Sequence, residues 1–493
     1  MIADGLKLSV YFGDSLTTGA ALSSDALMQR LAERRVRVAA LMRGVEGFGI
    51  NRRIHAERFP DISTDLPLLA MAVDERSTIE SLLEDVDAAV PRGLVTLERA
   101  TLATGEDVAG ATFPGGPGGA AKLTVYCGRG ETVGGRPAHR AVVETLRRHG
   151  AAGAIVLLGV DGAVDGRRTK ARLFAGNADT PVVIISVGSP RILERCLPHL
   201  RESLPDPVVT LENIAQLKHD GDLLEPPPTR DGDADPAVWH TLRVYSRQSA
   251  LVDGRSLHSE LTRRIREVGG AGVTTVLGEW GFSSDETPYG DRLGRLAGHA
   301  PTYTVYIDRP SKVAEVWPIV DDVTAEHGIV TWLVVPGYRE RAGDRVHGDL
   351  RLRDRAEPQA PGPLANTAPA GPPAGARATL PAVGTTDADW VRSLCEQVAA
   401  FAGARGRPEP LVRVTLADGE QFFLAAVEPT PGGGFVTLHP HPQRYDDMLS
   451  RADGPPMTPR VLIVPRASIA KIELLSRTPR GTRSLVGFRT TAS

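Results

Sequence analysis

A short glycine-rich segment carries most of the groups that could bind a small anion. It has the sequence Gly44-Val45-Glu46-Gly47-Phe48-Gly49 and is followed by Arg52, Arg53 and His55. Glycine lets backbone N–H groups approach a phosphate without hindrance from a side chain, and arginine adds charge-assisted hydrogen bonds. Glu46 could accept a hydrogen bond from an amino or hydroxyl group of the same ligand. The alternative is a mobile loop in which glycine only permits turns and the charges are solvated.

Further candidates for anion binding lie at Arg92 and in a second glycine pair. Gly134-Gly135-Arg136-Pro137 precedes a segment with helical apolar spacing, so Arg136 is expected at a helix N-terminus, where backbone N–H groups attract anions. His55 could contact the ligand or respond to pH, since histidine titrates near neutrality. Each of these side chains could equally be an ordinary solvated surface residue.

A pair of histidines invites a metal interpretation. His439 and His441 lie in His439-Pro440-His441-Pro442. No Cys, Asp or Glu stands close beside them in the chain, although most structural metal sites need four ligands. A proline-rich turn is therefore favoured, and no metal site is predicted.

The composition is that of an ordinary soluble protein. Hydrophobic residues make up 41% of the 493 positions, and the formal net charge of -3 offers no basic field for nucleic acid. Three widely spaced cysteines indicate neither a disulfide framework nor a zinc finger. No apolar run approaches the ~18 residues of a membrane span, and no secretory signal is visible. The sequence predicts a cytoplasmic protein.

Three similar segments follow one another along the chain. Leu6-Lys7-Leu8-Ser9-Val10-Tyr11 recurs at 121–126 and, more loosely, at 240–245. The next matching proline follows the tyrosine after 56 positions at Tyr11 and Tyr245, and after 55 at Tyr126. Such constant spacing predicts three tandem copies of one structural unit.

Each copy has the same expected order of elements, strand-helix-strand-strand-helix-strand. The first helices are expected at 24–34, 136–149 and 256–268. This βαββαβ order is the ferredoxin-like plan, in which both helices cover one face of the sheet. The other face needs cover, and Leu8 and Val10 are expected on it. Three such sheets around an axis would cover one another, so an α+β intramolecular pseudo-trimer is predicted.

Linkers and a further domain complete the expected organisation. The units are predicted at 1–102, 121–215 and 239–338, followed by a disordered linker rich in proline and alanine at 339–387. Residues 388–490 read as a short amphipathic helix and five short strands, which predict a small β-barrel.

A hydrolase is the sharpest alternative. Gly13-Asp14-Ser15-Leu16 is similar to the motif of GDSL hydrolases, whose nucleophile is the serine, and Asp344 and His347 could supply the later Asp-x-x-His. That block lies two copies away along the chain, however, and the other copies have different residues in place of Ser15. Common phosphate-loop, zinc and nucleophile motifs are not found. A protein without enzymatic activity is expected.

The repeated segments resemble a known family. Residues 7–13, 44–49, 53–55 and 63–67, together with Gly134-Gly135-Arg136-Pro137, are similar to the PII-like family catalogued as "domain of unknown function 190". The resemblance implies a trimeric ring in which effectors, often adenine nucleotides, bind between units. It also implies a loop after the second strand that contacts a transporter, channel or enzyme. Three copies in one chain imply a monomeric protein with internal threefold pseudosymmetry.

The copies differ in the residues that carry this resemblance. The first has the loop motif but lacks Gly-Arg-Pro, whereas the second has Gly-Arg-Pro but lacks the Phe and His of the loop. We expect a regulator that binds an ATP, ADP or AMP-type effector and needs no obligatory cofactor; the alternative is a scaffold with decayed sites. The expected ligand-binding residues are Gly44, Glu46, Gly47, Phe48, Gly49, Arg52, His55, Arg92, Gly134, Gly135 and Arg136, with no catalytic or metal-binding residue.

Overall fold

The computed structural model shows a chain that divides into two units, Met1–Leu364 and Ala365–Ser493. In the first unit the structure describes residues 1–49, 53–56, 65–114, 119–171, 180–228, 238–283, 287–290, 299–335, 337–342, 345–350 and 352. In the second unit it describes residues 391–392, 394–396, 398, 411–416, 421–429, 435–440, 462–465 and 468–475. Each unit is described by itself.

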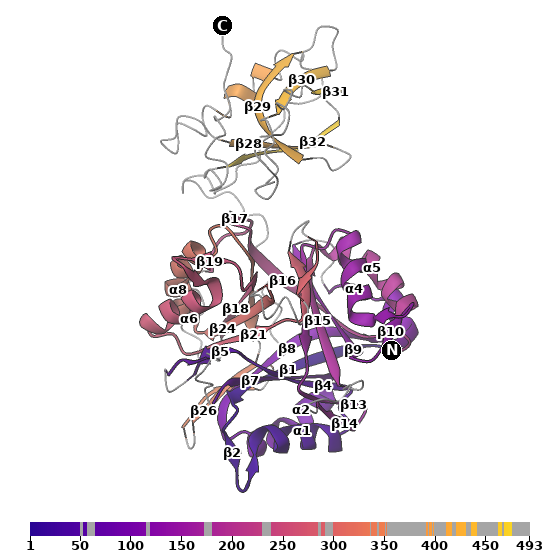
Figure 1. Ribbon diagram of the computed structural model, residues 1–493, viewed down its shortest axis with the longest axis vertical. Helices are drawn as coiled ribbons and strands as arrows, with labels where there is room; N and C mark the ends of the chain where they lie inside the picture. Colours follow the sequence, from indigo (N-terminus) through magenta and orange to yellow (C-terminus); the bar gives the residue numbers. More distant parts are fainter. Residues whose placement is uncertain are drawn as a thin grey trace. The chain divides into compact units, whose positions relative to one another are not determined.

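The first copy forms a four-stranded antiparallel sheet in the order β8-β1-β7-β4 (Figure 1). Its strands are β1 (Ile2–Gly13), β4 (Val38–Arg43), β7 (Pro67–Glu75) and β8 (Arg92–Thr104). Helix α1 (Ser23–Glu33) connects β1 to β4, and α2 (Arg76–Ser81) with α3 (Leu83–Ala89) connects β7 to β8.

The second and third copies repeat this strand order. The second sheet runs β16-β9-β15-β12 and consists of β9 (Ala120–Gly128), β12 (Gly153–Leu158), β15 (Pro181–Gly188) and β16 (Val208–His219), with α4 (Ala138–Arg148) and α5 (Pro190–Ser203). The third runs β25-β18-β24-β21 and consists of β18 (Trp239–Arg247), β21 (Val273–Leu277), β24 (Pro301–Asp308) and β25 (Ile329–Val335), with α6 (Leu257–Glu267) and α8 (Pro310–Val323). The predicted triplication is confirmed.

The helices of the first copy cover the side chains of Leu6, Leu8 and Val10, which share a core with Leu27 and Leu31 of α1. The assignment of Leu8 and Val10 to the open face is therefore wrong. The open face instead carries Lys7, Ser9 and Tyr11, and Lys7 and Ser9 are buried as well. Strand alternation fixed which residues share a face but not which face meets the helices.

A short hairpin precedes the first helix of each copy. The hairpins are β2 (Thr17–Thr18) with β3 (Ala21–Leu22), β10 (Thr132–Val133) with β11 (Arg136–Pro137), and β19 (Leu251–Val252) with β20 (Arg255–Ser256). Gly134 and Gly135 turn the second hairpin with φ of +56° and +77°, which glycine adopts readily. The helix predicted from Arg136 begins instead at Ala138, because strand pairing holds Arg136 and Pro137 extended.

Strand pairing between copies closes into a ring. The short strands β5 (Glu46–Phe48), β13 (Asp161–Val164) and β22 (Trp280–Ser283) pair with β21, β4 and β12 of another copy, respectively. The last strands are linked in the same way: β8 pairs with β16, β16 with β25, and β26 (Gly337–Ala342) with β8. Four small strands and a 3-10 helix extend these connections: β6 (His55–Ala56), β14 (Arg167–Lys170), β17 (Asp222–Leu223), β23 (Tyr289–Gly290) and η1 (Gly105–Gly110). Each copy therefore pairs with both others in one 21-stranded sheet.

The segment after the third copy returns to the first copy. Strand β26 pairs with residues 92–97 of β8, and β27 (Arg345–Asp349) folds back on β26. Arg339 bonds to the carboxylate of Asp87 in α3, and Tyr338 stacks on Trp239 with ring centroids 3.6 Å apart. The linker predicted from residue 339 thus begins later than expected, because β26 covers an edge of β8 that would otherwise be unpaired.

The C-terminal unit contains an antiparallel sheet in the order β31-β30-β29-β28-β32. Its strands are β28 (Leu411–Leu416), β29 (Gln421–Pro429), β30 (Phe435–Pro440), β31 (Leu462–Pro465) and β32 (Ile469–Leu475). Helical residues Val391, Leu394 and Val398 pack into its core. The five predicted strands are confirmed, and closure into a barrel stays a prediction.

Candidate ligand-binding site

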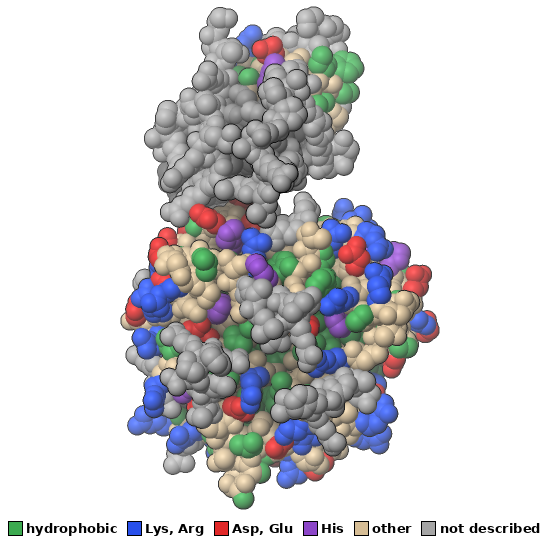
Figure 2. Space-filling view, in the orientation of Figure 1, with side chains coloured by type: hydrophobic (Ala, Val, Ile, Leu, Met, Phe, Trp, Pro, Cys, Tyr) green, Lys and Arg blue, Asp and Glu red, His purple; other side chains and the backbone are tan. Residues whose placement is uncertain are grey.

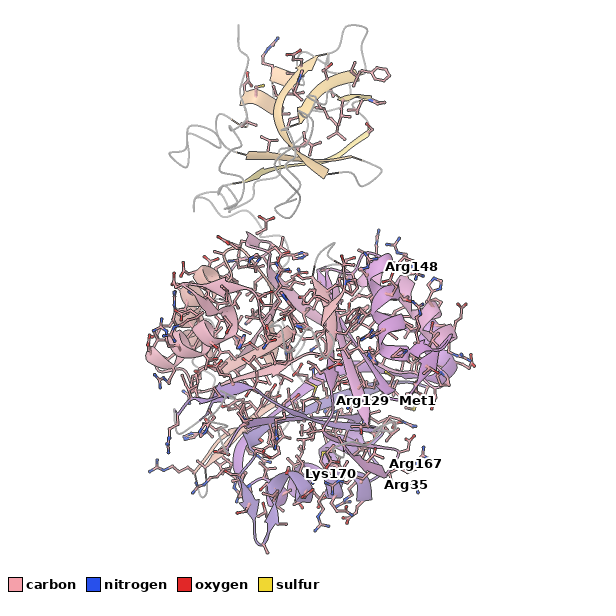
Figure 3. The ribbon with its side chains drawn as sticks, viewed as in Figure 1. Met1, Arg35, Arg129, Arg148, Arg167 and Lys170 are labelled. Atoms are coloured by element: carbon pink, nitrogen blue, oxygen red, sulfur yellow. The ribbon has the colours of Figure 1, made fainter. Side chains whose placement is uncertain are left out.

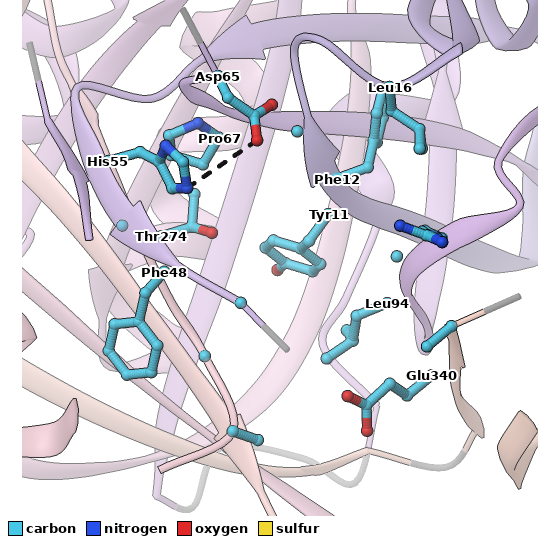
Figure 4. A pocket seen from close by; sticks show the side chains of 18 of the residues that line it. Tyr11, Phe12, Leu16, Phe48, His55, Asp65, Pro67, Leu94, Thr274 and Glu340 are labelled. Atoms are coloured by element: carbon cyan, nitrogen blue, oxygen red, sulfur yellow. Dashed lines mark ion pairs between the residues drawn. The ribbon is translucent and has the colours of Figure 1, made fainter. Parts of the chain in front are cut away.

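A cavity of about 750 Å³ opens between the first and third copies (Figure 4). The first copy contributes residues at the end of β1, in and around β5, and at the start of β8. The third contributes residues in and beside β21 and in β24, and β26, which follows the third copy, contributes Glu340 and Ala342. The lining side chains that Figure 4 labels are Tyr11, Phe12, Leu16, Phe48, His55, Asp65, Pro67, Leu94, Thr274 and Glu340. The volume is within the roughly 300–1,000 Å³ typical of small-molecule sites.

Gly44 and Gly47 allow the segment around β5 to pack closely beside the cavity. The N–H of Gly44 donates to the Pro67 carbonyl oxygen at 2.7 Å, and a Cβ at position 44 would lie 2.7 Å from Pro67 Cγ. A Cβ at position 47 would lie closer still to the Val273 carbonyl oxygen of β21, and Gly47 pairs opposite Thr274. The N–H of Gly44 is therefore engaged by the sheet rather than open to a phosphate. Gly49 has open space around its Cα and lines the cavity.

Glu46 and Phe48 connect the first copy to the third. Phe48 is buried in the core of the third copy, against residues of β18 and α6. The Glu46 carboxylate is 5% exposed and accepts a hydrogen bond from Ser259 Oγ of α6. His258 Nε2 lies 3.7 Å from the same carboxylate, and burial lowers the pKa of His258 to about 4. Glu46 thus contacts a neighbouring helix and does not line the cavity.

Five of the residues expected from the sequence line the cavity: Gly47, Phe48, Gly49, His55 and Arg92. Gly44 and Glu46 do not line the cavity, because Gly44 packs against Pro67 and Glu46 bonds to Ser259. Gly134, Gly135 and Arg136 are exposed on the β10–β11 hairpin of the second copy and are not part of this cavity. Arg52 lies outside the residues that the structure describes.

Charged groups lie at the rim of the cavity. Arg53 and Arg92 are both exposed there. Asp65 Oδ1 accepts hydrogen bonds from the backbone N–H and the Oγ of Ser15, at 3.1 and 2.7 Å. Figure 4 marks the ion pair between Asp65 Oδ2 and His55 Nε2, which are 3.9 Å apart. The rim thus offers both cations and hydrogen-bond acceptors to a ligand.

These contacts bear on the hydrolase alternative. Ser15 Oγ donates to a carboxylate rather than to an imidazole, which is not the arrangement of a serine nucleophile with its base. Asp344 lies outside the described residues. His347, in β27, pairs opposite Glu340, which lines the cavity. The block at His347 therefore lies near the first copy although it follows the third copy in the chain, because β26 pairs with β8 and β27 pairs with β26.

The sequence prediction does not include the cavity residues from the third copy or from β26, which follows it. Thr274 and Glu340 line the cavity, as does Tyr11 of the first copy. Burial raises the pKa of the Glu340 carboxyl. The recurring tyrosine of the first strand could have pointed to position 11, but the sequence does not say which copy packs against which.

The corresponding clefts have different shapes. The cleft between the third and second copies, called the third cleft, leaves only about 20 Å³. In it Ile155 occupies the pairing position that Thr274 has in the cleft between the first and third copies, called the first cleft. In the cleft between the second and first copies, called the second cleft, Val38 occupies the position that corresponds to Gly272 in the first cleft. Beside it Arg37 bonds to Asp165 at 2.9 Å and Arg35 packs against Gly166; Figure 3 shows Arg35 near Arg167. The three clefts have therefore diverged in structure.

The described residues provide little else that resembles a binding site. They contain no group of three or more His, Cys, Asp or Glu side chains placed to hold a metal ion. His439 lies 3.8 Å from Glu428, and His441 is not among the described residues. Within the described ranges, no helix is long and apolar enough to cross a membrane. Figure 2 shows basic and acidic side chains interspersed over one face of the first unit.

The fold and cavity define a protein of three tandem α/β copies, joined in a ring, with a small-molecule-sized cavity between its first and last copies. The family catalogued as domain of unknown function 190, described as "Uncharacterized ACR", matches residues 5–102, 120–216 and 239–336. These ranges make up more than half of the chain, and the protein belongs to this family.

Proposed function

We propose that this protein is a non-enzymatic PII-like regulator that binds a small anionic effector in the cleft between its first and third copies. In this proposal three ferredoxin-like units form an intramolecular pseudo-trimer. The strand order 4-1-3-2, shared by all three copies, and the ring of pairings support that arrangement. The chain would be monomeric in the cytoplasm, and light scattering that shows an obligate trimer of chains would contradict this.

The cavity is the observation that carries the proposal. Phe12, Leu94 and Phe48 give it apolar walls, and Arg53 and Arg92 place cations at its rim. Such a mixture suits a ligand with a flat or apolar part and an anionic part. An adenine nucleotide such as ATP, ADP or AMP combines both parts. The effector would in turn alter contacts with a target, for which a membrane transporter, a channel or an enzyme is proposed.

A scaffold without a ligand is the second candidate function. The nearly closed third cleft favours it, because it shows that ligand space can be lost in this ring. In that case the protein would act only through protein contacts.

Calorimetric titration separates these two functions. The full-length protein is titrated with AMP, ADP, ATP and inorganic phosphate under the same conditions. Saturable binding of at least one adenine nucleotide, tighter than that of phosphate, is the expected result. Binding of none of the four ligands would reject the effector proposal and favour the scaffold.

A further inference from the structure

Five charged side chains meet at the centre of the ring, where the open faces of the three sheets come together. Lys7 Nζ lies 2.7 Å from Glu98 and 2.9 Å from Glu212, while Lys122 Nζ lies 3.2 and 3.0 Å from the same two carboxylates. Arg243 Nη2 contacts the other oxygen of Glu98 at 2.5 Å. Each of the five residues is at most 3% exposed.

The charges of this central cluster do not balance. In the first two copies, Lys7 of β1 pairs opposite Glu98 of β8, and Lys122 of β9 pairs opposite Glu212 of β16. The third copy has Thr241 opposite Leu333 at the corresponding positions, and its Arg243 enters from two residues further along β18. Three cations therefore face two carboxylates. Arg243 Nη1 is buried without a hydrogen-bond partner in the described part of the chain.

A buried charge without a partner is costly, and the cost is lowest if one cation releases its proton. Burial and then repulsion by Arg243 lower the pKa of Lys122 to about 7. Burial alone would raise the pKa of Glu98, but Arg243, Lys122 and Lys7 hold it well below its usual range. Lys7 lies closer than Lys122 to both carboxylates, and its pKa is raised despite burial. Lys122 is thus the group that gains or loses the proton.

The central cluster is electrostatically connected to the cavity through Tyr11. The Tyr11 side chain lines the cavity, as Figure 4 shows. Burial, Tyr303 and Glu98 raise the pKa of its phenol, whereas Arg243 and Lys7 of the cluster lower it. Tyr126 faces the cluster from the strand of Lys122, and Tyr245 and Tyr303 face it from β18 and β24.

We propose that this central cluster is a proton-dependent control element for anion binding in the cavity. With Lys122 protonated, the centre of the ring carries one excess positive charge, which strengthens the attraction of an anion in the neighbouring cavity. Loss of that proton neutralises the cluster and weakens binding. The inference rests on the proposed function, whose effector is an anion.

Thermal unfolding as a function of pH tests the cluster without any ligand. The pKa of Lys122 is about 7 in the folded state, below its unfolded value of 10.5. Burial of the protonated lysine therefore lowers the free energy of unfolding by its full amount below pH ~7, and this loss of stability disappears as the pH rises. The wild-type Tm should therefore rise from pH 7 to 9 relative to that of Lys122→Met. Lys218→Met is the matched control, because Lys218 is equally buried but binds Asp321 away from the cluster. It should keep the wild-type pH dependence.

ADP affinity at pH 6.5 and 8.5 tests the connection to the cavity. Between these two pH values the ADP affinity of the wild type should fall by a factor on the order of 3- to 10-fold larger than the affinity of Lys122→Met does. Titration of Glu340 and of the ADP phosphate occurs in both proteins and cancels in this comparison. Arg243→Gln, which removes the imbalance itself, should behave as Lys122→Met does. Equal losses in wild type and variants would overturn this inference alone, whereas binding of none of AMP, ADP, ATP and phosphate by the wild type would overturn the proposed function with it.

Discussion

Gly47 of the first copy lies so close to Val273 of the third that a Cβ at position 47 would overlap with the Val273 carbonyl oxygen. This approach allows β5 to pair with β21, and that pairing joins the first and last copies of the chain. The same strand pairing holds Phe48 and Gly49 against the cavity. One small residue therefore contributes both to ring closure and to the shape of the candidate site.

Replacement of Gly47 by alanine should destabilise the first unit. The added methyl group meets backbone atoms that cannot move independently, so we expect a loss of about 1–3 kcal/mol in the free energy of unfolding. Gly49→Ala is the matched control, because nothing lies within 4 Å of its added Cβ. Chemical denaturation of both variants measures the difference. Equal stability of the two would show that close packing at Gly47 does not support the ring.

Arg92→Ala should weaken nucleotide binding. Loss of one charge-assisted hydrogen bond costs about 1.5–3 kcal/mol, or roughly 10- to 150-fold in affinity. Arg136→Ala serves as the comparison, since Arg136 lies on an exposed hairpin of the second copy and does not line the cavity. If calorimetry instead shows a loss only in Arg136→Ala, the ligand binds at the second copy, as the motif of that hairpin suggested.

Thr274→Ile should close the cavity without unfolding the protein. The third cleft already has isoleucine at the corresponding position, Ile155, and leaves only about 20 Å³. We expect nucleotide affinity to fall at least 10-fold, while the far-ultraviolet circular dichroism spectrum stays that of the wild type. Thr274→Ser, which keeps the space open, should bind nearly as the wild type does. Unchanged affinity of the isoleucine variant would place the ligand elsewhere.

Much of the fold could be predicted because it is repeated. The spacing from Tyr11 to Pro67 marks where the first and third strands stand, and the recurring proline begins the third strand of every copy. Pro67, Pro181 and Pro301 each accept a hydrogen bond from a glycine of the same copy, Gly44, Gly159 and Gly278. Because the same local contact forms in all three copies, its residues recur at nearly constant spacing in the sequence.

The site was harder to predict than the fold. Gly47, Phe48 and Gly49 were found because they belong to one local segment, but Glu46 turned out to contact α6 of another copy. Thr274 and Glu340 come from strands more than 200 positions away from this segment. Their approach depends on which copy each edge pairs with, and a single sequence does not contain that information.

The number of nucleotides bound per chain tests the central claim most directly. Calorimetric titration of the wild-type protein with ADP should give one site per chain. The cavity of about 750 Å³ has no equal in the third cleft, and in the second cleft Val38 stands where the first has Gly272. Thr274→Ile should abolish that site. Three equivalent sites per chain, or a site that persists in Thr274→Ile, would contradict the account.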